Sequence, residues 1–139
     1  MSKKALGLIE LIERDHRNLE ALFEKLRSAI LTGKAEQAQT AFLQLQVSEE
    51  EHFAVEERIM REYRYPHLER HKTYHDSLRK TMLTIERVLL AERPKNLHTD
   101  IAEYIAETLN HIEEADNPLQ TFLRDKASDA AKEAPHKSL

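Results

Sequence analysis

Apolar residues recur every three or four positions through four long stretches of this chain, which is the spacing of one face of an α-helix. The first stretch stops near Gly33, the second before Pro66 and the third before Pro94. The fourth begins at about residue 97 and carries an expected interruption at Asn117-Pro118. Four helices joined by short loops predict an all-α protein, an antiparallel up-down-up-down four-helix bundle with a short C-terminal extension.

Length and composition limit the alternatives. A chain of 139 residues can bury one substantial core, and we expect a single domain over residues 1–126 followed by a polar, flexible tail at 127–139. The absence of an apolar run of 18 residues predicts no membrane partner, and the absence of cysteine excludes disulfides and thiolate metal sites and agrees with a cytoplasmic location. A net charge of −4 with both signs interspersed predicts no nucleic-acid partner.

Each apolar stripe contains polar residues at positions that its spacing assigns to the core. They are His16 in the first stretch, Glu49, His52 and Glu56 in the second, His71 and His75 in the third, and His111 in the fourth, with Asp116 beside its end. The other histidines, His67, His98 and His136, lie outside the stripes, and we expect Glu50, Glu51 and Glu57 to form a solvated acidic face. Because a buried polar group without a partner is costly, the inward set needs a partner.

A single core histidine is usually satisfied by a backbone carbonyl, and a single pair of histidines arises easily by chance. Five inward histidines on four helices, together with two carboxylates, would need seven separate sets of hydrogen-bond partners in one apolar layer. We therefore favour a shared metal site. Imidazole and carboxylate ligands suit iron, manganese or zinc, and seven ligands are too many for one structural zinc. Two six-coordinate ions have about twelve positions; five histidines, two bridging carboxylates and a bridging oxygen leave about one open for a small ligand.

These residues resemble the ligand motifs of the hemerythrin family, and in particular its single-domain bacteriohemerythrins. The matching segments are IERDH, HFAVEE, YPHLERHKTYH and HIEEAD, which together contain His16, His52, Glu56, His71, His75, His111 and Asp116. The resemblance extends over about residues 8–125 and makes the expected domain a hemerythrin-like four-helix bundle.

The resemblance implies a site with two iron ions joined by a bridging oxo or hydroxo group. It assigns one iron to His71, His75 and His111, the other to His16 and His52, and the bridging role to Glu56 and Asp116. It further implies a protein that is not an enzyme but reversibly binds dioxygen, for carriage, storage or delivery, at the open position near His16 and His52. Leu109 would line the oxygen pocket, and Glu49 would either enter that pocket or support a ligand histidine.

Other functions of the same residues stay open. An oxidase or iron-handling protein of the ferritin-like carboxylate class uses Glu-x-x-His pairs, which occur here at Glu13–His16 and Glu49–His52, but that class would leave three core histidines unused. A nitric-oxide-related role shares the site chemistry. Oxygen sensing would require an output domain on a partner protein, which the sequence does not identify.

Overall fold

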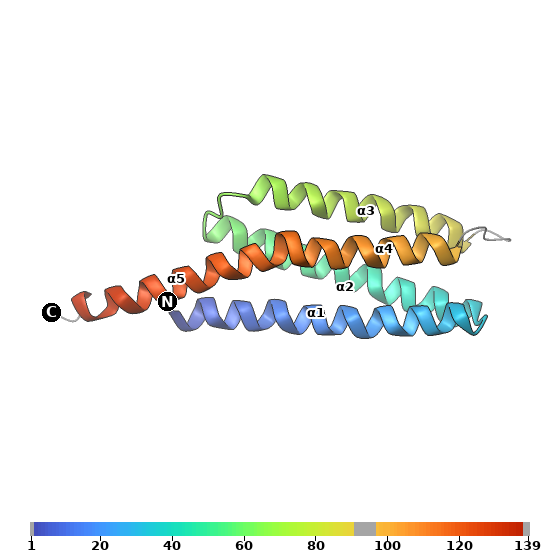
Figure 1. Cartoon of the computed structure of the whole chain (residues 1–139), viewed down its shortest axis with the longest axis horizontal. Coiled ribbons are helices and arrows are strands. Elements are labelled where there is room, and N and C mark those ends of the chain that lie inside the picture. Colours follow the sequence, from blue (N-terminus) through green and yellow to red (C-terminus); the bar gives the residue numbers. More distant parts are fainter. Residues whose placement is uncertain (1, 91–96, 138–139) are drawn as a thin grey trace.

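The computed structural model describes the backbone of residues 2–90 and 97–137 (Figure 1). Regular structure in these residues is helical: α1 (Ser2–Leu31), α2 (Ala35–Glu62), α3 (Leu68–Leu90), α4 (Leu97–His111), the short π-helix η1 (Ile112–Asp116) and α5 (Asn117–Lys137). Helices α1 and α3 run in one direction, α2 and α4 run in the other, and α5 continues α4 through η1. The predicted antiparallel four-helix bundle is confirmed. No described helix is long and apolar enough to cross a membrane.

Helices α1 and α2 end in the same backbone motif. After α1, Gly33 has φ 69° and the amide of Lys34 donates a hydrogen bond to the carbonyl of Ala29 at 2.8 Å. After α2, Arg64 has φ 53° and the amide of Tyr65 closes the equivalent bond across the last turn. This Schellman arrangement needs a left-handed residue, which glycine adopts without strain and arginine adopts at a cost of roughly 1–2 kcal/mol. Both motifs reverse the chain for the next antiparallel helix.

The buried apolar side chains form two clusters separated by a layer of polar side chains. The larger cluster lies toward the α1–α2 connection and includes Leu19, Phe23, Phe42, Leu45, Leu78 and Tyr104. The smaller cluster lies toward the α2–α3 connection and includes Ile9, Ile12, Ile59, Met60, Leu119 and Leu123. The polar layer between them is built from one or two turns of each helix, so both of its faces are covered by apolar side chains.

The fourth helical segment of the bundle continues through Asn117–Pro118 without a break, which corrects the expected interruption. The backbone passes through η1 into α5, which stays helical to Lys137 and projects beyond the start of α1 (Figure 1). The expected tail therefore begins as helix, and Ala127 is buried. Flexibility of residues 127–139 and a domain boundary at 126 stay predictions.

Candidate metal centre

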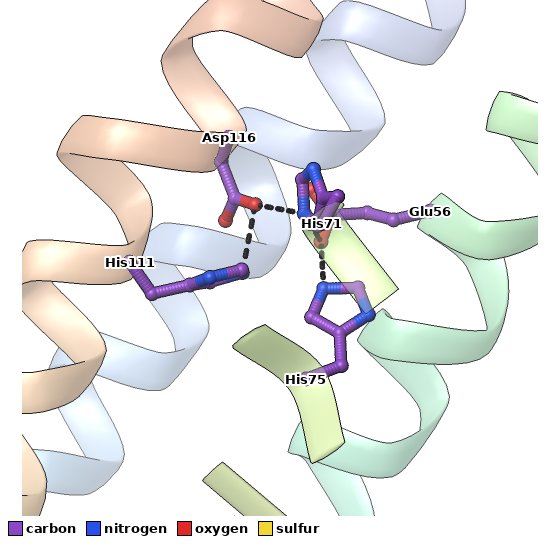
Figure 2. Close-up of side chains that lie close together, drawn as sticks. All are labelled: Glu56, His71, His75, His111 and Asp116. Atoms are coloured by element: carbon purple, nitrogen blue, oxygen red, sulfur yellow. Dashed lines mark hydrogen bonds and ion pairs between the residues drawn. The ribbon is translucent and has the colours of Figure 1, made fainter. Parts of the chain in front are cut away.

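The polar layer brings together the seven residues that the sequence proposed as metal ligands. Within the described part of the chain they form two groups, in each of which the potential ligand atoms lie within 4.8 Å of one another. One group is Glu56, His71, His75, His111 and Asp116 (Figure 2), and the other is His16, His52, Glu56 and Asp116. Two carboxylates therefore stand between a three-histidine half (His71, His75 and His111) and a two-histidine half (His16 and His52).

Asp116 directs its two oxygens to different halves. Its Oδ1 lies 2.8 Å from Nε2 of His71 and 3.0 Å from Nε2 of His111. Its Oδ2 lies 2.9 Å from Nε2 of His16 and 3.7 Å from Nε2 of His52. A carboxylate that bridges two metal ions has this orientation, with one oxygen available to each ion.

Glu56 reaches both halves from helix α2. Its Oε1 lies 3.1 Å from Nε2 of His75, 3.2 Å from Nε2 of His52 and 3.5 Å from Nε2 of His71. Its Oε2 forms no hydrogen bond with any described side chain. Figure 2 shows Glu56 and Asp116 approaching the histidines from opposite sides.

A π-helical turn aligns His111 with Asp116. In an α-helix, residues five apart are rotated by about 140° around the axis, so the two side chains would face different directions. In η1 the hydrogen bonds reach five residues back, as from the amide of Asn117 to the carbonyl of Ile112, and this brings residues five apart onto one side. The turn also ends two residues before Pro118, whose ring has no amide hydrogen and would clash within the interior of a regular α-helix. The five-residue spacing is the sequence signal for this turn.

Although the side chains of the polar layer lie close together, many of their nitrogens and oxygens form no hydrogen bond. Several nitrogens and oxygens lack a hydrogen bond of acceptable geometry to any described group: Nε2 of His52, His71 and His111, Oε2 of Glu56 and Oδ1 of Asp116. Buried polar atoms are almost always paired, so atoms that converge without pairing fit a cation between them. The donor set of imidazole nitrogen and carboxylate oxygen suits iron, manganese or zinc.

The layer keeps negative charge in the interior of the bundle. Burial and the charge of Asp116 act to raise the pKa of Glu56, but the surrounding histidines outweigh them and hold that pKa below its usual range. Burial also acts to raise the pKa of Asp116, whereas the four histidines close to its oxygens, His111, His16, His52 and His71, hold it well below its usual range. Burial acts to lower the pKa of His71, but Asp116 and Glu56 raise it to about 9. The protonated His71 faces the two ionised carboxylates, and a metal cation bound between them would replace its proton.

Carboxylates also hold the outer ring nitrogens of two histidines. Nδ1 of His52 lies 3.1 Å from Oδ2 of Asp15, and Nδ1 of His75 lies 3.1 Å from Oε2 of Glu57. Arg79 donates a hydrogen bond of 2.9 Å to the same oxygen of Glu57. A histidine that donates from Nδ1 presents an unprotonated Nε2, the form that binds a metal.

Sequence analysis missed both of these carboxylates. Glu57 was expected on a solvated acidic face but is buried against His75, and Asp15 had no assigned role. Each is the chain neighbour of a proposed ligand, Glu56 or His16. The signal that was available is chemical: a metal-binding histidine needs an acceptor for its second nitrogen.

The two residues assigned to the ligand pocket occupy different places. Glu49 is 1 % exposed, and burial raises its pKa to about 8, with His52 exerting the strongest opposing charge effect. Leu109 is 47 % exposed, so its expected position in the pocket is wrong. Its neighbour Thr108 is 2 % exposed and lies on the inward face with His111, which is nearly one helical turn away. Leu109 points elsewhere because adjacent residues of a helix are rotated by about 100°.

Two surface hollows border the polar layer. One of about 200 Å³ is lined by His71 together with Tyr65, Arg70 and the exposed His67, as expected for a histidine outside the stripe. The other, of about 250 Å³, is lined by His52 and other side chains of α1 and α2. Each hollow therefore borders one proposed ligand histidine. The side chains of His98 and His136 lie outside the described residues.

Comparison with known proteins gives one result. A family model described as the hemerythrin HHE cation binding domain matches residues 7–123, which include all seven proposed ligands. No curated protein and no solved structure matched the chain.

Proposed function

The chain belongs to the family of hemerythrin HHE cation-binding domains, and from this premise we propose that it is a non-haem di-iron protein that reversibly binds dioxygen. Its cofactor would be two iron ions with a bridging oxo or hydroxo group, and its role the carriage, storage or delivery of dioxygen. It is an oxygen-binding protein rather than an enzyme in this proposal, and it acts in the cytoplasm.

The observation that carries the proposal is the unequal division of ligands around the two shared carboxylates. Three histidines and two carboxylates surround one position, whereas two histidines and the same two carboxylates surround the other. The half with His16 and His52 therefore has one protein ligand fewer. When bound, the iron pair would supply two redox electrons and, in that half, an open position for a small ligand.

The remaining side chains would prepare and protect this site. Asp15 and Glu57 hold the rings of His52 and His75 in the orientation that presents Nε2 to a metal. Phe53 stacks on His75 with ring centroids 4.2 Å apart, which fixes that ring on its apolar side. The apolar clusters on both sides of the layer keep bulk water away from the ligand atoms, which strengthens the interactions of charged groups there.

An oxidase-type or nitric-oxide-related role is the second candidate, and one observation favours it. Glu49 and Thr108 place a carboxyl and a hydroxyl group where a stable oxygen carrier needs a dry wall. Polar groups beside the open position would stabilise charged forms of a ligand and hasten loss of the oxygenated state.

An absorption experiment distinguishes the two candidates. The protein is loaded with ferrous iron without air, and spectra are recorded before air, after air and after the oxygen is removed again. Two irons per chain and a visible charge-transfer band that appears with air and disappears without it would support reversible binding. A direct and irreversible passage to the oxidised spectrum would refute reversible binding and favour the second candidate.

Matched histidine variants provide the control for this experiment. His67→Ala removes an exposed histidine and should still load two irons. His111→Ala removes a buried histidine of the three-histidine half and should load fewer. Equal loading of both variants would contradict the proposed ligand set.

A further inference from the structure

Arg79 of α3 holds three carboxylates beside the contact between α2 and α3. Its Nε donates a hydrogen bond of 2.8 Å to Oε1 of Glu50, its Nη2 one of 2.9 Å to Oε2 of Glu57, and its Nη1 one of 2.8 Å to Oδ1 of Asp76. Each of the three guanidinium nitrogens thus has a carboxylate partner. A rigid, planar group whose donors are all directed at acceptors is held in one orientation, whereas a single exposed ion pair is not.

The three carboxylates differ in their surroundings. The side chains of Glu50 and Asp76 are 53 % and 54 % exposed, so water can solvate them without Arg79. The side chain of Glu57 is 11 % exposed, and the oxygen that accepts from Arg79 also lies 3.1 Å from Nδ1 of His75. Of these three partners, only Glu57 therefore connects Arg79 to a proposed metal ligand.

A second contact leads from Arg79 to the same histidine. The central carbon of its guanidinium group lies 5.0 Å from the centroid of the Phe53 ring, within the range of a cation–π interaction. The Phe53 ring in turn stacks on the ring of His75, with an angle of 19° between the two planes. Arg79 therefore touches both groups that hold the His75 ring, the carboxylate at its Nδ1 and the aromatic ring on its face.

The two-histidine half has no equivalent cation. Oδ2 of Asp15 lies 3.1 Å from Nδ1 of His52, as Oε2 of Glu57 does from Nδ1 of His75. Within the part of the chain that the structure describes, however, Asp15 forms no ion pair with a lysine or an arginine. Arg79 thus supports one half of the metal centre only.

We propose that Arg79 is a positioning residue of the metal centre: by holding Glu57 against His75, it sets how tightly the three-histidine half binds its metal. This inference rests on the metal centre of the proposed function. Without Arg79, the carboxyl group of Glu57 would be free to rotate toward solvent into another of its staggered conformations. The ring of His75 would then lose its acceptor at Nδ1, and its Nε2 would be directed at the metal for less of the time.

Ferrous-iron affinity, measured without air in a chelator competition titration, tests this role. The wild type is compared with Arg79→Met, which keeps an unbranched stem and loses the guanidinium group. The control is Glu50→Gln/Asp76→Asn, which alters the two exposed partners and leaves the contact with Glu57. We expect Arg79→Met to bind one of the two irons at least about tenfold more weakly and the other with nearly unchanged affinity. The control should bind both irons as the wild type does.

Two results of this titration would overturn the proposal. Equal weakening of both irons in Arg79→Met would mean that Arg79 supports the bundle as a whole. A control that binds iron as weakly as Arg79→Met would mean that the exposed ion pairs, and not the contact with Glu57, are what matters.

A double-mutant cycle tests whether Arg79 acts through Glu57. Glu57→Leu removes both carboxyl oxygens at nearly the same size, so that Arg79 has no acceptor to hold against Nδ1 of His75. In this background, Arg79→Met should lower the iron affinity by no more than about twofold, because effects that pass through one contact are not additive. A further loss of about tenfold in the Glu57→Leu background would show that Arg79 acts elsewhere, and it would overturn the proposal.

The visible absorption of the Co²⁺-loaded protein provides a readout that a purely structural role would not move. These bands depend on the ligands of the metal and on their geometry. We expect Arg79→Met and Glu57→Leu to change the bands in the same way, and the control Glu50→Gln/Asp76→Asn to keep those of the wild type. Wild-type bands in Arg79→Met, together with a lower melting temperature in excess chelator, would assign Arg79 to helix packing alone and overturn the proposal.

The wild type separates this inference from the proposed function. A wild type that binds no metal would refute the proposed function and, with it, any role of Arg79 in metal binding. A wild type that binds two metals, with Arg79→Met binding both equally well, would refute the role of Arg79 and leave the proposed function intact.

Discussion

Replacing Glu49 by glutamine should stabilise the protein in a way that depends on pH. Glu49 is a buried acid whose pKa burial raises from 4.5 to about 8. The charged groups that act on it are His52, which lowers the pKa, and Asp116, Glu56 and Glu50, which raise it. Glutamine has nearly the same shape and no proton to lose, so the substitution removes the titration and leaves the packing.

The size of the effect follows from the difference between the folded and unfolded pKa. Between pH 4.5 and 8 the unfolded chain releases the Glu49 proton while the folded chain keeps it. The folded state then binds more protons, so the free energy of unfolding of the wild type falls as pH rises through this window. At pH 7 the window spans 2.5 units from 4.5, which corresponds to about 3 kcal/mol that Glu49→Gln recovers. The gain should be near zero at pH 4.5 and level off above pH 8.

Urea denaturation at several pH values between 4.5 and 8.5 measures this gain. Wild type, Glu49→Gln and the exposed control Glu51→Gln are compared in excess chelator, so that the absence of metal is common to all three. The difference between wild type and Glu49→Gln should grow with pH, and the control should show no such trend. A difference that stays constant from pH 5 to pH 8, or a variant less stable than the wild type at pH 7, would refute the assignment of a protonated, buried Glu49.

Three further perturbations test the site and its surroundings. His16→Ala should remove the metal of the two-histidine half and keep the other metal, whereas His111→Ala should do the reverse. Metal analysis per chain measures this. Equal loss of both metals in each variant would contradict the division of the ligands into two halves. Glu57→Gln should weaken metal affinity by about 10- to 100-fold in a chelator competition titration, because the acceptor for His75 Nδ1 is altered; unchanged affinity would remove Glu57 from the site. Leu109→Ser should change the free energy of unfolding by no more than about 0.5 kcal/mol and leave metal content intact, because Leu109 is largely exposed. A loss of several kcal/mol would mean that the Leu109 side chain is buried.

Periodicity by itself determined the helices and most of their inward residues. A helix in a bundle buries one face, and the face of each side chain follows from its position in the 3.6-residue repeat. His16, for example, falls one turn after Ile12 and one turn before Leu19, both of which are buried in the core. On α4, Thr108 lies one turn before His111 and is buried, whereas the placement of Leu109 came from the family resemblance and was wrong.

The spacing of residues along one helix does not indicate its contacts with another helix. Asp15 reaches His52 from α1 to α2, and Glu57 reaches His75 from α2 to α3. Such pairs depend on how far one helix is rotated and shifted against the next, which the spacing within one helix does not record. An acidic residue such as Glu57, on a helix with many acidic residues, is therefore predicted to be solvated, although it contacts His75 of the next helix.

The sequence by itself determined that the five histidines, Glu49 and Glu56 turn inward, because the direction of a side chain depends on local helix geometry. The family resemblance implied that the ligands divide into two halves, but only the tertiary structure decided the interatomic distances that make this division. The two oxygens of Asp116 meet histidines from α1, α3 and α4, and they do so because the π-turn of η1 keeps the helix continuous while it adds one residue to the turn. That division depends on distances between helices of a few ångströms, which packing of the two apolar clusters sets and no pattern along the chain contains.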